Sequence, residues 1–255
     1  MKNTLKRWLQ KLGLLELIQE FSKVIRNFFG IVTPRYLAFS QAGEDIILTF
    51  LFQEKKINLA EVSYLDIGAC HPFSGNNSYF LYYSGSKGVL IEPTKNYENY
   101  FKKIRTRDLF LNICITPNEG ESSVKLYYSG GGSGSTIDKL EAEKRVALGI
   151  KIEKIYEVPA KTINRVIDEH FDRYPVFLSI DIEGVDLSVL KSLDFERFKI
   201  PVILVETCVF SLTHVRPKDP EIFNFMQGKG YEVYADTYIN TIFVKKDWFY
   251  KEASL

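Results

Sequence analysis

Short apolar runs alternate with helical patterns along most of the chain. Apolar runs bounded by turn residues predict buried strands at 62–67, 87–91, 109–115, 176–182 and 202–205. Apolar residues spaced three or four positions apart predict helices at 46–53, 77–83, 97–104, 162–171 and 185–193. Strands that alternate with helices in this way predict a parallel, doubly wound α/β sheet with helices on both faces.

The regular alternation of strand and helix patterns is interrupted in the middle of the chain and at its end. The pattern predicts an edge strand at 122–128, a charged helix at 138–148 and a short strand at 155–158. The glycine-rich run at 130–135 reads either as a surface linker or as a mobile lid. After a helix at 221–227, runs at 231–235 and 241–245 predict an antiparallel strand pair.

The first 35 residues differ from the rest. Lysine and arginine outnumber acidic residues there, and apolar residues such as Leu5, Trp8, Leu12 and Leu15 recur at helical spacing. We expect a basic amphipathic helical extension over 1–38 and a separate domain over 39–255. Three interpretations of the extension stay open: packing on the domain or on a second subunit, an interfacial membrane contact, or disorder.

Composition narrows the class of protein. The 255 residues carry a formal net charge of +1, which gives no electrostatic support for a nucleic-acid partner. The three cysteines, Cys70, Cys114 and Cys208, form no disulfide framework and fit a reducing cytoplasm. The sequence shows no signal peptide and no apolar stretch of about 18 residues that would span a membrane.

Two strand ends suggest a cofactor site. The run 64–67 ends in a turn that contains Gly68 and Ala69, where backbone amides can approach a ligand closely. The run 87–91 ends at Glu92, about 25 residues further on, where a carboxylate can grip a ribose diol. No phosphate-cradling GxGxxG or GxxxxGK[ST] motif is present. The pattern therefore favours a nucleoside cofactor without a bound phosphate, most simply S-adenosyl-L-methionine.

From Ser40 to Lys245 the chain resembles the FkbM-type, S-adenosylmethionine-dependent methyltransferases. Six segments in order carry the resemblance: 40–45 (SQAGED), 66–72 (DIGACHP), 77–80 (NSYF), 91–93 (IEP), 181–186 (DIEGVD) and 205–207 (VET). The family often has asparagine at the positions of Cys70 and Thr94. The resemblance implies a Rossmann-like class I methyltransferase fold: a mostly parallel seven-stranded sheet with an antiparallel C-terminal strand pair.

Several residues are candidates for binding the cofactor. Asp66 can orient the cofactor's amino group, or it caps the following turn. Glu92 can accept both ribose hydroxyls, or it is a solvated acid at a strand end. The resemblance implies that Gln41, Glu44 and Asp45 line the pocket, although acids at a helix N-terminus fit the same positions. Further candidates are Gly68, Ala69, Asn112 and Asp181, with Ser135 and Thr136 near the adenine.

Chemistry is expected at the ends of the later strands. Methyl transfer to a hydroxyl needs an acceptor held at attack distance and a base for its proton. Asp181 is the favoured base or positioning residue, with His214, Glu206 and His71 as alternatives. Asp181, Glu183 and Glu206 could instead hold a divalent ion, but we expect no metal, because no zinc-type ligand spacing occurs.

The sequence and the resemblance together predict an O-methyltransferase. The acceptor that the family implies is a sugar hydroxyl of a glycan or glycoconjugate. The rivals are a small-molecule, lipid or protein acceptor, a nicotinamide-dependent oxidoreductase, and a non-catalytic domain that retains the fold. We expect a cytoplasmic protein; a peripheral contact at the inner membrane face and a homo-oligomer both stay open.

Overall fold

The computed structural model describes residues 37–130, 134–211 and 216–251. The extension predicted at the N-terminus therefore lies outside the described residues. The described residues from Ala38 onward belong to a unit that spans Ala38–Leu255. No helix in these described ranges is long and apolar enough to cross a membrane.

A seven-stranded sheet forms the centre of this unit, in the order β3-β2-β1-β7-β8-β10-β9. Its strands are β1 (Tyr64–Ile67), β2 (Gly88–Ile91), β3 (Leu109–Leu111), β7 (Phe177–Ile180), β8 (Val202–Glu206), β9 (Tyr231–Asp236) and β10 (Asn240–Lys245). Strands β3, β2, β1, β7 and β8 pair in parallel. Strand β10 inserts between β8 and β9 and is antiparallel to both. This topology confirms the predicted class I methyltransferase fold.

Helices cover both faces of the sheet. The helices are α3 (Glu44–Glu54), α4 (Tyr79–Tyr83), α5 (Glu98–Ile104), α7 (Ile163–His170), α8 (Asp186–Ser192), α9 (Pro220–Gly228) and α10 (Lys246–Phe249), with a 3-10 turn η1 (Leu59–Glu61). One buried cluster joins α7, α8 and α9 to the sheet, and a second joins α3, α4 and α5 to its opposite face. Strand β1 serves both, because Leu65 and Ile67 face the first cluster and Tyr64 faces the second.

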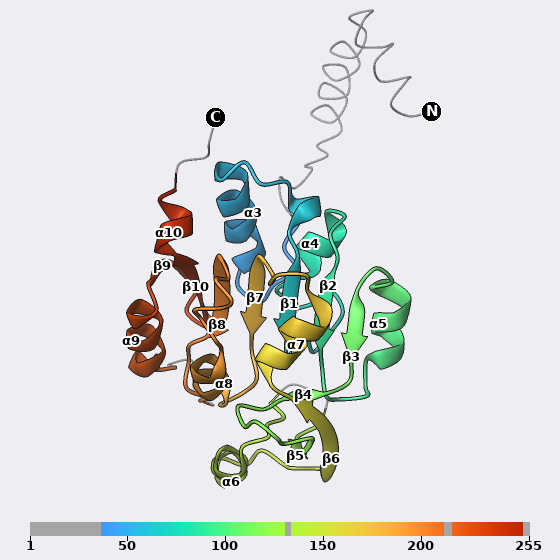
Figure 1. The fold of residues 1–255 in the computed structure, drawn as a ribbon. Coiled ribbons are helices and arrows are strands. Elements are labelled where there is room, and N and C mark those ends of the chain that lie inside the picture. The colour runs from blue at the N-terminus through green and yellow to red at the C-terminus, as the bar shows by residue number, and fades with distance from the viewer. Residues whose placement is uncertain (1–36, 131–133, 212–215, 252–255) are drawn as a thin grey trace, which may run out of the picture. The chain divides into compact units, whose positions relative to one another are not determined.

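A small second sheet lies beyond the ends toward which β1 and β7 run (Figure 1). It consists of β4 (Cys114–Ile115), β6 (Lys154–Lys161) and β5 (Ser123–Tyr128), and α6 (Lys139–Ala147) lies between β5 and β6 in the chain. The prediction of one continuous strand over 109–115 is wrong, because the structure has two short strands there, β3 and β4. The run divides at Asn112, whose side-chain amide donates to the carbonyls of Glu92 and Thr94 (2.8 and 3.3 Å), and its second half joins the small sheet.

Candidate active site

An open cavity of about 970 Å³ lies at the carboxyl ends of β1, β2 and β7. Ligands of open α/β sheets bind at this edge. The turns after these strands form one side of the cavity, and residues of the insertion between β4 and β6, including Leu126, Ser135 and Thr136, form another. Nine of the candidate residues line it: Gln41, Asp66, Gly68, Ala69, Glu92, Ser135, Thr136, Asp181 and Glu183.

The turn after β1 is pressed against both neighbouring strands. Gly68 has φ +85°, and a Cβ atom there would lie 1.8 Å from the carbonyl oxygen of Asp181. The amides of Gly68 and Ala69 both donate to the carbonyl of Ile91 (2.9 and 3.1 Å). Only glycine fits this position, because it needs both the left-handed conformation and the missing side chain.

Glu92 ends the run of β2 with a buried carboxylate that is 4% exposed. One oxygen accepts from the amide of Cys70 (2.9 Å) and the other from the amide of Thr94 (2.8 Å). Burial raises its pKa. Since a carboxylate has about four acceptor positions, each oxygen keeps one for a ligand hydroxyl. Cys70 has φ +47°, a conformation in which asparagine is also well tolerated, as in the family pattern.

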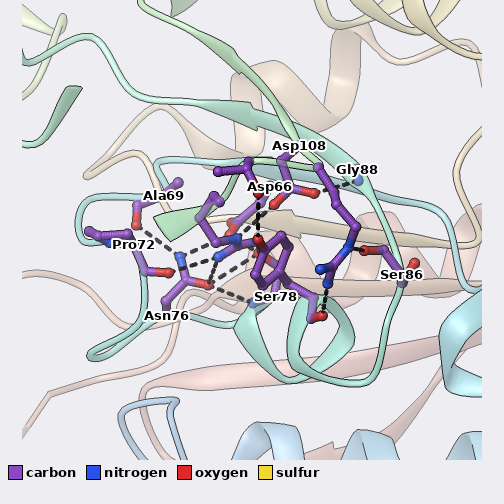
Figure 2. Close-up of polar contacts among 12 residues, drawn as sticks. Asp66, Ala69, Pro72, Asn76, Ser78, Ser86, Gly88 and Asp108 are labelled. Atoms are coloured by element: carbon purple, nitrogen blue, oxygen red, sulfur yellow. Dashed lines mark hydrogen bonds and ion pairs between the residues drawn. The ribbon is translucent and has the colours of Figure 1, made fainter. Parts of the chain in front are cut away.

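Asp66 lies near the end of β1, and its carboxylate accepts hydrogen bonds from other side chains of the protein (Figure 2). One carboxylate oxygen accepts from the hydroxyl of Ser78 (2.6 Å) and from the amide of Asn76 (3.2 Å). Burial raises the pKa of Asp66, while these hydrogen bonds oppose the shift. The carboxylate thus lines the cavity and also fixes the loop that follows β1.

Arg105 fixes the same loop from the other side, and the sequence reasoning missed it. Its guanidinium donates to the carbonyl of Pro72 (2.9 Å), to the side-chain oxygen of Asn76 (3.2 Å) and to the hydroxyl of Ser78 (3.0 Å). It also pairs with Asp108 (2.6 Å), and both side chains are 0% exposed. A buried cation with a complete set of partners holds the loop in one conformation. The only signal in the sequence is an arginine at a helix end with an aspartate three residues later.

Asn77 lines the cavity, and the sequence analysis did not single it out as a ligand. Its amide nitrogen donates to the hydroxyl oxygen of Ser179 (3.3 Å), and Ser179 in turn is hydrogen-bonded to Asp66. Because the serine proton is directed to Asp66, the serine oxygen can only accept from Asn77. The carboxamide oxygen of Asn77 has no partner among the described residues. Such an acceptor in a cavity wall is suited to a cationic or N–H donor on a ligand.

The acids that precede β1 hold the fold together. Asp45 accepts from the amide and hydroxyl of Ser40, the latter at 2.8 Å, and so ties the N-terminus of α3 to its loop. Glu44 accepts from the side chains of Thr237 (2.7 Å) and Asn240 (2.8 Å). Neither acid is among the residues that line the cavity, whereas Gln41 is. The role of Asp45 and of Asn112 at the cofactor stays a prediction.

Three carboxylates meet at the ends of β7 and β8. Asp181, Glu183 and Glu206 each place an oxygen within 4.8 Å of the others. Asp181 and Glu206 are hydrogen-bonded to each other. Burial, followed by the neighbouring acids, raises the pKa of Glu206 to about 8, and burial and Glu206 raise that of Asp181. The pair therefore retains a proton near neutral pH. The three side chains also offer oxygen ligands suited to a divalent cation.

Glu183 links this centre to the insertion. It has φ +57°, and its carboxylate accepts from the amide of Gly134 (3.1 Å) and pairs with Arg145 of α6 (3.0 Å). Arg145 also donates to the carbonyl of Gly134 (2.7 Å). These contacts hold Gly134 at the cavity, where it is part of the lining.

The two candidate histidines differ in what the structure says of them. His214 lies outside the described residues. The ring of His71 packs edge-on against Phe73 and Tyr97, with centroids 4.6 and 4.9 Å away, and its Nδ1 accepts from the amide of Ser74 (3.0 Å). Burial lowers its pKa, and it is not among the cavity-lining residues. Both stay predictions as catalytic bases.

Comparison with known proteins identifies the family. The family model described as "Methyltransferase FkbM domain" matches residues 66–233, which extend from the end of β1 into β9. The chain belongs to the FkbM methyltransferase family. S-adenosylmethionine is the cofactor of this family, and the cavity residues fit it, because Glu92 offers acceptors for a diol and lies in the same cavity as the turn at Gly68 and Ala69.

One solved structure similar to this FkbM domain is a 1,6-didemethyltoxoflavin-N1-methyltransferase from Burkholderia thailandensis, crystallised with 1,6-didemethyltoxoflavin and S-adenosylhomocysteine. The two chains share 10% identity, with a TM-score of 0.39, over 89% of this chain and 88% of the other. No curated protein matches the sequence.

Proposed function

We propose that this FkbM protein transfers the methyl group of S-adenosylmethionine to an oxygen acceptor, a sugar hydroxyl of a glycan or glycoconjugate. The observation that carries the proposal is the hydrogen-bonded pair of Asp181 and Glu206 at the edge of the cofactor cavity. A hydroxyl acceptor must lose a proton as it is methylated, and a carboxylate beside the cofactor can take it.

The cavity supports a specific assignment of cofactor-binding residues. Glu92 would hold the ribose hydroxyls, and the free carboxamide oxygen of Asn77 would accept from the cofactor's ammonium group. The adenine would lie against apolar lining residues such as Ile113, Ile115 and Leu126. These groups are suited to a diol, a cation and a flat apolar ring, which correspond to the ribose, the ammonium group and the adenine of S-adenosylmethionine.

The chain's own residues account for the proton. S-adenosylmethionine supplies a methyl group bonded to a positively charged sulfur. As the methyl group is transferred, whichever carboxyl of the Asp181–Glu206 pair is ionised would take the proton of the acceptor hydroxyl. Burial raises the pKa of both carboxyls, that of Glu206 to about 8, and a carboxylate of raised pKa is a stronger general base.

The test measures cofactor binding and turnover separately. We expect calorimetry to detect S-adenosylhomocysteine binding by the wild-type protein and by Glu206→Gln, whereas Glu206→Gln loses methylation of a glycan acceptor. Retained binding with no turnover by the wild-type protein on any acceptor would favour a non-catalytic domain. Turnover on small molecules, lipids or proteins alone would reject the glycan. Loss of turnover on chelation would show that the three carboxylates act through a metal.

The N-terminal extension has its own hypothesis. We propose that residues 1–38 form a basic amphipathic helix that brings a cytoplasmic domain (39–255) to the inner membrane face, where lipid-linked saccharides are handled. Basic and apolar residues along 1–35 support it. Flotation of the full chain with anionic liposomes should be lost on deletion of residues 1–35; unchanged flotation refutes the hypothesis. Oligomeric state is measured in the same preparations by light scattering.

A further inference from the structure

A second cavity, of about 600 Å³, lies beside the cofactor cavity, and Glu183 lines both. Its walls come from α6, the turn between β7 and α8, the end of β8 and the start of α9. Asp181 lines the cofactor cavity and Glu206 lines the second one, and the two carboxyls are hydrogen-bonded. The two cavities therefore meet at the pair that we assign to proton removal.

We propose that the second cavity binds the methyl acceptor and selects an uncharged, hydroxyl-bearing ring over an anionic one. The inference rests on the proposed function and adds the place and charge preference of acceptor binding.

The charge of the lining disfavours an anion. Five acids line the cavity: Glu141, Glu183, Asp186, Glu206 and Asp219. Arg145 is the one cation among the described lining residues. Its guanidinium is already paired with Glu141 (3.1 Å) and Glu183 (3.0 Å). Among the described lining residues, a carboxylate or phosphate on the acceptor would thus find no free cation and would meet negatively charged acids, even though Glu206 shares a proton with Asp181.

The remaining lining suits a ring with an apolar face. Leu187, Val209, Phe210 and Ile222 contribute apolar surface. The guanidinium carbon of Arg145 lies 4.4 Å from the centroid of the Phe210 ring and holds that ring in place. A sugar ring can pack its C–H face on such a surface while its hydroxyls donate to the surrounding carboxylates. The cavity therefore offers both kinds of contact that a neutral sugar makes.

The experiment uses the full chain saturated with S-adenosylhomocysteine. Saturation-transfer NMR is recorded with neutral methyl glycosides, with the corresponding methyl uronosides and with sugar phosphates. We expect the neutral glycosides to bind and the anionic probes to bind at least about tenfold more weakly. Equal or tighter binding of the anionic probes, or no binding of any neutral glycoside at millimolar concentration, overturns the proposal. Failure to bind S-adenosylhomocysteine would instead overturn the proposed function.

Two variants place the binding site. Phe210→Ala should weaken the binding of neutral glycosides about tenfold. Its affinity for S-adenosylhomocysteine should be unchanged, and this also shows that the variant is folded. Asp219→Asn should narrow the difference between neutral and anionic probes, because asparagine keeps the N-cap of α9 and removes the charge. Asp194→Asn is the matched control, since Asp194 also accepts from backbone amides but does not line the cavity. Unchanged binding in both cavity variants overturns the assignment.

Discussion

The close approach of β1 and β7 at Gly68 gives the sharpest prediction of the structure. In Gly68→Ala, the new methyl group would lie 1.8 Å from the carbonyl oxygen of Asp181 and 3.4 Å from the side chain of Ile182. The first distance is far below van der Waals contact, and the obstacle is backbone that no rotamer change can move away. The strands must separate, or the turn that carries Ala69 must shift.

Two contributions set the magnitude. A non-glycine residue at φ +85° is strained by about 1–3 kcal/mol. Overpacking against the carbonyl adds about 1–3 kcal/mol. Gly120 separates the two, because it has the same φ of +85° and a Cβ atom added there would meet nothing within 4 Å. Gly120→Ala should therefore show the strain alone, and Gly68→Ala should be less stable than Gly120→Ala by about 1–3 kcal/mol.

Thermal unfolding and calorimetry measure both consequences. For a chain of this size each kcal/mol lowers Tm by about 2–4 °C, so Gly68→Ala should melt below Gly120→Ala by at least that amount. Because Gly68 and Asp181 both line the cofactor cavity, affinity for S-adenosylhomocysteine should fall about tenfold or more in Gly68→Ala alone. Equal melting temperatures and equal affinities in the two variants would refute the reasoning.

Four further predictions follow from individual contacts. Glu92→Gln should weaken S-adenosylhomocysteine binding about tenfold or more, since its amide nitrogen would face a backbone N–H that the carboxylate now accepts from; unchanged calorimetric affinity contradicts this. Asn77→Leu should weaken the binding of S-adenosylhomocysteine but not that of 5′-methylthioadenosine, which lacks the ammonium group. Equal losses of affinity for both ligands would reject the assignment of Asn77 to that ammonium group. Arg105→Met should destabilise by about 3–5 kcal/mol, because Asp108 would be left buried and unpaired, as denaturant unfolding measures. Turnover should rise with pH through about 8 as Glu206 ionises. The free energy of unfolding should fall between about pH 4.5 and about pH 8, because the folded protein favours the protonated form of Glu206. In Glu206→Gln this dependence of stability on pH should be weaker.

The sheet and its strand ends were predictable because each depends on local pattern. Continuous apolar runs predict buried strands, and a carboxylate or glycine directly after such a run lies at the edge where ligands bind. Gly68, Glu92 and Asp181 were found in this way, and all three line the cavity. The antiparallel pairing of β9 and β10 was predicted from two short apolar runs that lie close together in the sequence near the C-terminus.

Other features depend on contacts between distant parts of the chain. Arg105 and Ser78 are 27 residues apart and Asn77 and Ser179 are 102 apart, so no periodicity reports their hydrogen bonds. The division of the strand at Asn112 depends on carbonyls supplied by the loop after β2. The second cavity is formed by four segments that only the tertiary fold brings together.

A crystal structure of the protein with S-adenosylhomocysteine tests the central claim most directly. We predict a nucleoside in the cavity between the ends of β1 and β2, with its ribose hydroxyls within hydrogen-bonding distance of the Glu92 carboxylate. A nucleoside bound elsewhere, or a ribose that makes no contact with Glu92, would contradict it.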